Sequence, residues 1–83
     1  MNVLITPQAA AQIDALPRPI RARVYKIVER LRRWPDVSGV KPLSGDLAGH
    51  YRMRTGDYRV QLRIAAATVL IERVGHRDGF YDD

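Results

Sequence analysis

The fold of this protein is decided by residues 50–64, which read HYRMRTGDYRVQLRI. On both sides of Thr55-Gly56, apolar or aromatic residues alternate with arginine or other polar residues. This period of two is typical of β-strands with one buried face. Glycine supplies the positive φ that a two-residue turn requires. The pattern therefore predicts a hairpin of strands 50–54 and 57–64, with Thr55-Gly56 as its turn.

The alternation sorts the side chains of this hairpin onto two faces. The predicted core face carries Tyr51, Met53, Tyr58, Val60, Leu62 and Ile64. The other face, called here the arginine face, carries Arg52, Arg54, Arg59, Gln61 and Arg63. A third strand, 68–74, follows a turn near Ala66-Ala67 and adds Val69 and Ile71 to the core face and Glu72 to the arginine face.

The predicted turn places Arg52 directly opposite Arg59. Like charges directly opposite each other destabilise a sheet, so stability alone does not explain them. We interpret the arginine face as an anion site, with a nucleic-acid backbone as the favoured ligand. The alternative is a solvated face on which Asp57 and Glu72 act as partial counterions.

The N-terminal half predicts one short strand and two helices. Residues 2–6, NVLIT, form the strand, Thr6 caps the first helix, and Pro7 lies in its first turn. The first helix buries Ala9, Ile13 and Leu16. The second buries Ile20, Val24, Ile27 and Leu31, at spacings of four, three and four. Pro19 opens this second helix, and Trp34-Pro35 stops it.

These elements predict one α+β domain that spans residues 1–83. The order is β-α-α-β-β-β, with both N-terminal helices on one face of a small, largely antiparallel sheet. Residues 35–49 form a Pro/Gly/Ser-rich connection, part of which, around Val40–Leu43, is expected to be extended.

The charge of the chain favours an acidic partner. The net charge is +5, and the bases are 12 arginines and only 2 lysines. Arginine is the residue of forked phosphate and carboxylate recognition, although a host proteome with arginine-rich codons gives the same bias. The absence of cysteine excludes disulfides and thiolate chemistry. The longest apolar run, IAAATVLI at 64–71, is too short to span a membrane, and the N-terminus does not read as a leader, so a soluble cytoplasmic protein is expected.

Residues that could do chemistry gather at the C-terminal end, in GHRDGFY at 75–81. Metal chemistry is not expected, because His50 and His76 are the only histidines, and no Gly-rich phosphate loop or other cofactor motif is present. RNA cleavage without a metal needs a base, an acid and cations. His76 titrates near neutral pH and suits either proton role, Tyr81 suits one if nearby cations activate it, and Arg77 can hold charge but not exchange a proton.

Two segments, KPLSGDLAGHYRMRTGDYRVQLRI at 41–64 and VLIERVGHRDGFY at 69–81, resemble the RelE/ParE superfamily of type II toxin–antitoxin toxins. The resemblance covers nearly the whole chain. It implies a RelE-like fold and, for the RelE branch, a metal-independent endoribonuclease that enters the ribosomal A site and cuts mRNA through the substrate's own 2′-hydroxyl. By motif, Arg52 and Arg54 match two basic positions on the first hairpin strand, Lys41 matches a basic position in the preceding loop, and the active-site positions fall on Arg59, Arg77 and Tyr81.

The chain departs from this pattern at one point. The best-known RelE toxin has lysines at the positions of Arg52 and Arg54, and one of them is a candidate base. Arginine keeps the charge but not the base chemistry, which leaves Tyr81, His76 or the ribosome itself as the base.

The resemblance also implies a cognate antitoxin that forms a hetero-oligomer with the toxin and covers the arginine face. The ParE branch inhibits DNA gyrase and generally lacks the RNase residues, so Arg59, Arg77 and Tyr81 together favour RelE. A third reading is a basic, non-catalytic module that acts with the antitoxin.

Overall fold

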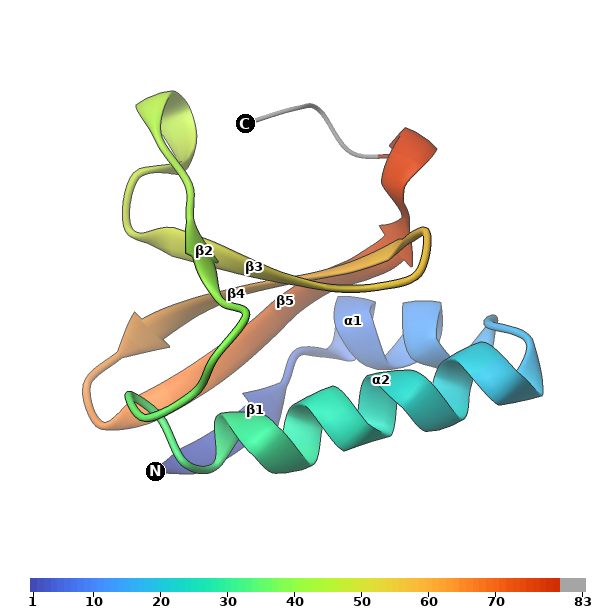
Figure 1. The fold of residues 1–83 in the computed structure, drawn as a ribbon, viewed down its shortest axis with the longest axis horizontal. Coiled ribbons are helices and arrows are strands. Elements are labelled where there is room, and N and C mark those ends of the chain that lie inside the picture. The colour runs from blue at the N-terminus through green and yellow to red at the C-terminus, as the bar shows by residue number, and fades with distance from the viewer. Residues whose placement is uncertain (80–83) are drawn as a thin grey trace.

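The structure, a computed structural model, describes residues 1–79. A β-strand and two helices come first, followed by a run of strands (Figure 1). The elements are β1 (Asn2–Ile5), α1 (Pro7–Asp14), α2 (Arg18–Leu31), β2 (Lys41–Pro42), the 3₁₀ turn η1 (Gly45–Leu47), β3 (His50–Thr55), β4 (Tyr58–Ala65), β5 (Thr68–His76) and the 3₁₀ turn η2 (Arg77–Gly79).

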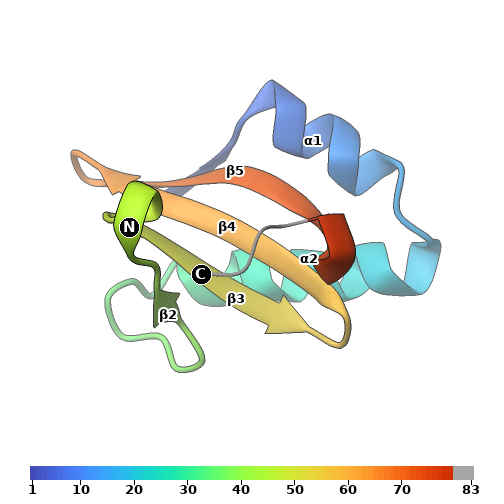
Figure 2. The same ribbon diagram turned by 90° about the horizontal axis from the view of Figure 1, so that it is seen from above.

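The strands form one five-stranded sheet in the order β1-β5-β4-β3-β2. β1 runs parallel to β5, and every other pair is antiparallel. Both helices lie on one face of the sheet, while η1 and η2 rise on the other (Figure 1). Viewed from above, β3, β4 and β5 lie in front of α2 (Figure 2). The predicted α+β architecture, with helices on one face of a largely antiparallel sheet, is confirmed, as is an extended segment inside 40–43.

The start of α1 follows from its capping residue. The Thr6 Oγ1 accepts a hydrogen bond from the Ala9 backbone N–H at 3.2 Å, which satisfies one of the donors that a helix N-terminus leaves unpaired. Pro7 occupies the first turn, where its missing N–H costs nothing. The predicted cap and first turn are confirmed.

The core lies between the helices and the sheet. Both layers contribute to it, and its buried residues are Ala9, Ile13, Val24, Ile27, Val28, Leu31, Met53, Val60, Leu62, Val69, Ile71 and Val74. Val24, Ile27 and Leu31 recur at helical spacing on α2, and Met53, Val60 and Leu62 alternate along β3 and β4. The predicted core faces of the second helix and of the hairpin are confirmed at these positions, whereas Ile20 and Tyr58, also predicted to face the core, are only half-buried and lie outside the core cluster.

The predicted turn of the hairpin is wrong. Thr55 pairs with Tyr58, so Gly56 and Asp57 are the two turn residues. Gly56 has a φ of 58°, and a hairpin turn of this kind needs glycine at the first of its two central positions. The register consequently shifts by two residues, and a shift of two returns every side chain to the same face. Arg59 faces Arg54 instead of Arg52.

The strand β5 contains an irregularity that the simple alternation does not predict. Gln61 pairs with Arg73, but Leu62 pairs with Ile71, so Glu72 is an extra residue in a β-bulge. Gln12 on α1 accepts a hydrogen bond from the Val74 backbone N–H next to this bulge, Oε1 to N, at 2.7 Å. Within residues 1–79, no helix is long and apolar enough to cross a membrane.

Candidate nucleic-acid interface

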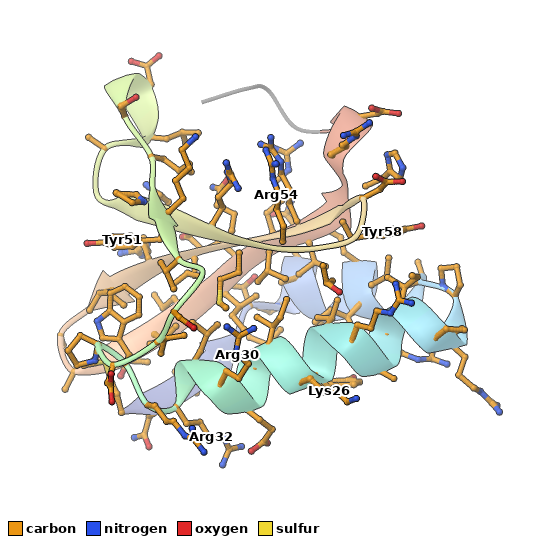
Figure 3. The ribbon with its side chains drawn as sticks, in the orientation of Figure 1. Lys26, Arg30, Arg32, Tyr51, Arg54 and Tyr58 are labelled. Carbon is orange, nitrogen blue, oxygen red and sulfur yellow. The ribbon has the colours of Figure 1, made fainter. Side chains whose placement is uncertain are left out.

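The arginine face gathers cations from three adjacent strands. On β2, Lys41 pairs with Arg52 of β3, and two residues further along β3, Arg54 pairs with Arg59 of β4. Figure 3 shows Arg54 on the side of the sheet that faces away from the helices. The structure therefore brings together four of the predicted site residues, including Lys41, which lies outside the hairpin.

The four cations differ in their access to solvent. Arg54 and Lys41 are exposed and Arg52 is half-buried, but Arg59 is only 5% exposed. The expectation that all hairpin arginines stand on an open face is wrong for Arg59, because its strand lies inside the sheet between β3 and β5. A buried guanidinium acts over distance through a low dielectric, so Arg59 adds positive potential from beneath the surface while Arg54 meets solvent directly.

One end of the arginine face carries its own counterion. Glu72, the bulge residue, accepts a hydrogen bond from Arg63 Nε at 2.8 Å, and its other oxygen lies 3.0 Å from His50 Nε2. The predicted position of Glu72 on the arginine face is confirmed. The strand alternation does not predict the contact of His50 with Glu72.

The sequence does hold a signal for this cluster. The buried residues of β5 are Val69, Ile71 and Val74, so their spacing changes from two to three around Glu72. A break of this kind in a strand pattern indicates a bulge, and bulges redirect side chains.

The 3₁₀ turn η2 lies at the other end of the arginine face. The Arg77 backbone N–H donates to the Asp57 carbonyl at 2.7 Å, and the Arg77 Nε lies 3.9 Å from the Asp57 carboxylate. Arg73 also donates a hydrogen bond to the Gly79 carbonyl. These contacts place the exposed Arg77 beside the β3–β4 turn, at the end of the sheet where Arg54 and Arg59 pair.

His76 is directed away from these cations. Gly75 pairs with Arg59, so the next residue, His76, projects to the opposite face of the sheet. There it pairs with Tyr58, and the two rings make an edge contact with centroids 5.3 Å apart. The His76 Nδ1 accepts a hydrogen bond from the Asp78 backbone N–H at 3.2 Å. Tyr81, the other predicted proton-transfer residue, lies outside the described residues.

The described side chains offer no obvious metal site. Within residues 1–79, no three His, Cys, Asp or Glu side chains come together in a group that could hold a metal ion. The arginine face can stabilise negative charge through Lys41, Arg52, Arg54 and Arg59. The fold and the site define a small α+β protein with a cationic sheet face opposite its helices.

Comparison with known proteins places this arrangement in a family. The model of the ParE toxin of type II toxin–antitoxin systems matches residues 3–79. Toxin RelE3 of Methanocaldococcus jannaschii is 28% identical over 99% of this chain and 97% of its own length. A chain in the crystal structure of the toxin–antitoxin complex RelBE2 from Mycobacterium tuberculosis is 38% identical, with a TM-score of 0.80 over 92% of this chain and 96% of that one.

A chain in the RelB–RelE antitoxin–toxin complex from Methanococcus jannaschii shares the fold, with a TM-score of 0.77, 24% identity and coverage of 92% of both chains. The protein therefore belongs to the ParE toxin family of type II toxin–antitoxin systems, within the RelE/ParE superfamily. The predicted superfamily is confirmed.

Proposed function

We propose that this toxin is a metal-independent endoribonuclease that cuts mRNA in the ribosomal A site and thereby stops translation. The cation cluster carries the proposal: Arg54 faces Arg59, and Lys41 faces Arg52 on the adjoining strands. A cluster of cations on paired strands attracts anions, and RNA presents a continuous row of phosphates.

The proposed reaction proceeds by attack within the RNA strand. The 2′-hydroxyl oxygen of one nucleotide attacks the neighbouring phosphorus, and the bond from phosphorus to the next 5′-oxygen breaks. The products are a 2′,3′-cyclic phosphate and a free 5′-hydroxyl. Arg52, Arg54, Arg59 and Arg77 remain protonated throughout, so we assign them the stabilisation of negative charge on the phosphate, with Lys41 as a further phosphate contact.

The two proton transfers need other groups. A base removes the 2′-hydroxyl proton, and an acid delivers a proton to the leaving 5′-oxygen. His76 is one candidate: its Nδ1 is engaged by Asp78, which leaves Nε2 to exchange a proton. His76 lies beside Tyr58, however, on the other side of its strand from Gly75, the partner of Arg59. We therefore favour Tyr81 or a group of the ribosome for the proton transfer next to the phosphate.

We further propose that a cognate antitoxin binds the toxin and covers the arginine face with an acidic segment. Support comes from two similar solved structures, both of which are toxin–antitoxin complexes. Electrostatic recognition of this kind weakens as salt is raised.

A second candidate function is inhibition of DNA gyrase. Both candidate functions would take place in the cytoplasm. The matching family model is that of ParE toxins, which favours gyrase inhibition, whereas similarity to Toxin RelE3 and to a chain of the RelBE2 complex favours the first candidate. A supercoiling assay with purified gyrase distinguishes the two.

The experiment that tests the proposal is a translation reaction with purified toxin, in which the 5′ ends of the mRNA are mapped. New ends that appear only in translated message support it. Arg54→Ala is expected to reduce cutting, and Tyr81→Phe tests the phenol. Arg18→Ala removes an equally exposed arginine from α2 and is the matched control. A folded wild-type toxin that makes no cuts would refute the proposal. Inhibition of supercoiling by the toxin in the gyrase assay would then support the second candidate function.

A further inference from the structure

A second row of cations runs along α2, on the other side of the molecule from the arginine face. Its members are Arg23, Lys26, Arg30 and Arg33, at spacings of three, four and three, which we call the α2 stripe. This spacing keeps Arg23, Lys26 and Arg30 on one side of the helix, and Arg33 follows in the turn two residues after its end. All four are exposed. At 1.5 Å per residue the helical part of the stripe, from Arg23 to Arg30, is about 10 Å long.

Two carboxylates lie near the C-terminal end of the α2 stripe without pairing with it: Asp36 and Glu29 each line a hollow with Arg30 and Arg33. The one acidic residue of α2, Glu29, is directed to Arg32, with a distance of 3.6 Å between Nη2 and Oε1. Among residues 1–79, no carboxylate forms an ion pair with a member of the stripe. Figure 3 shows Arg30 beside the segment that follows α2, where its Nη2 donates to the Ser38 carbonyl at 2.7 Å.

Both ends of the stripe extend onto neighbouring features. At the C-terminal end, Arg30 and Arg33 line a hollow of about 340 Å³ together with Glu29 and Arg32. At the other end, Arg23 reaches the β3–β4 turn, where its Nη1 lies 3.6 Å from the position that a Cβ on Gly56 would occupy. Two residues before Gly56, Arg54 begins the arginine face, so positive charge continues around this edge of the molecule.

The composition of the stripe favours a nucleic acid over a protein partner. Protein interfaces are centred on apolar and aromatic anchors. The large hydrophobic residues exposed within the described part of the chain are Met1, Leu4 and Tyr25, and none of them belongs to the stripe. A regular row of cations without apolar residues suits the phosphates that border the groove of a double helix.

We propose that the α2 stripe binds the phosphate backbone of double-helical RNA, as a docking surface separate from the arginine face. The choice of RNA over DNA rests on the proposed function, whereas the existence of a backbone-binding stripe does not. Such a surface holds the toxin against a structured RNA while the arginine face remains available to a single strand.

The test is direct binding of the full-length toxin to a short fluorescent RNA duplex, measured by anisotropy over a range of salt concentrations and without ribosomes. The variant Lys26→Ala/Arg33→Ala removes two stripe cations and leaves the Arg30 contact with Ser38 in place. Each lost phosphate contact lowers the salt slope by roughly 0.7–0.9, so we expect a slope smaller by about 1.5 and binding weaker by about 10- to 30-fold near physiological salt.

The control is Arg18→Ala/Arg21→Ala, which removes the same charge from a different side of α2, together with the 3.5 Å hydrogen bond from Arg21 to the Asp14 carbonyl. Circular dichroism melts of both variants check that they fold. The control is expected to bind within about threefold of wild type. Equal losses in both double variants would show that net charge alone binds RNA, and would overturn the proposal.

Binding measurements with two other ligands, a DNA duplex and polyglutamate, identify the kind of partner. A DNA duplex of the same sequence that binds more tightly than RNA would overturn the choice of RNA. If the double variant Lys26→Ala/Arg33→Ala loses affinity for polyglutamate but not for the RNA duplex, the stripe is a site for an acidic protein and the proposal fails. Because none of these measurements involves translated mRNA, their failure leaves the proposed cleavage activity to its own test.

Discussion

Replacement of Glu72 by glutamine should make this protein less stable and, at the same time, a better ligand for RNA. Glu72 is a carboxylate of the arginine face, and its two oxygens lie 2.8 Å from Arg63 Nε and 3.0 Å from His50 Nε2. Glutamine has nearly the same shape but no charge, and it keeps only one oxygen as an acceptor. Both contacts are weakened, and one positive charge on the face loses its counterion.

The size of the stability effect follows from the burial of the carboxylate. Hydrogen bonds to charged groups contribute about 1.5–3 kcal/mol when buried. The Glu72 side chain is 27% exposed and the Arg63 side chain 43%, so solvent screens part of this interaction. A net loss of about 1–2 kcal/mol is expected, which for a domain of this size corresponds to a fall in Tm of roughly 6–12 °C.

The Glu72→Gln substitution should strengthen RNA binding although it weakens the fold. For a phosphate bound on the order of 8 Å from residue 72, at an effective dielectric near that of water, removal of the negative charge would gain about 0.5 kcal/mol, or about twofold in affinity. Thermal denaturation and anisotropy with a single-stranded RNA at low salt measure the two effects. Asp14→Asn makes the same charge change at the exposed end of α1 and should show neither. Unchanged Tm would refute the stabilising role of the cluster, and weaker RNA binding would refute the arginine face as the anion site.

Substitutions at three further positions test the fold. Leu62→Ala, at a fully buried core position, should cost about 2–5 kcal/mol and leave little folded protein at 37 °C, whereas Leu62→Met should cost less than about 1.5 kcal/mol in urea denaturation. Thr6→Ala should lower the free energy of unfolding by about 1 kcal/mol through loss of the bond to Ala9, and Thr6→Ser should restore most of it. Gly56→Ala should cost about 1–2 kcal/mol because its φ of 58° is unfavourable for a residue with a Cβ; a melt unchanged from wild type would contradict the observed turn.

The periodic features of this protein could be predicted from the sequence. Met53, Val60 and Leu62 alternate with polar residues, and that alternation determined which face of the hairpin is buried whatever the register. On α2, the recurrence of Val24, Ile27 and Leu31 determined the buried side of the helix in the same way. These predictions depend on neighbours within one element, whose relative directions are fixed by backbone geometry.

The details of the site were decided only by the tertiary structure. Which arginine faces Arg59 depends on where Gly56 falls in the turn, and the burial of Arg59 depends on strands to either side of its own. At the bulge, Glu72 contacts both His50 and Arg63. Next to it, the Val74 backbone N–H donates to Gln12, which is 62 residues away in sequence. His76 follows Arg59's partner Gly75 by a single residue and therefore projects to the other face. A local pattern gives the direction of a side chain within its own strand, but the partner opposite it is set by strand pairing between distant segments, because register and bulges are fixed by packing of the whole sheet.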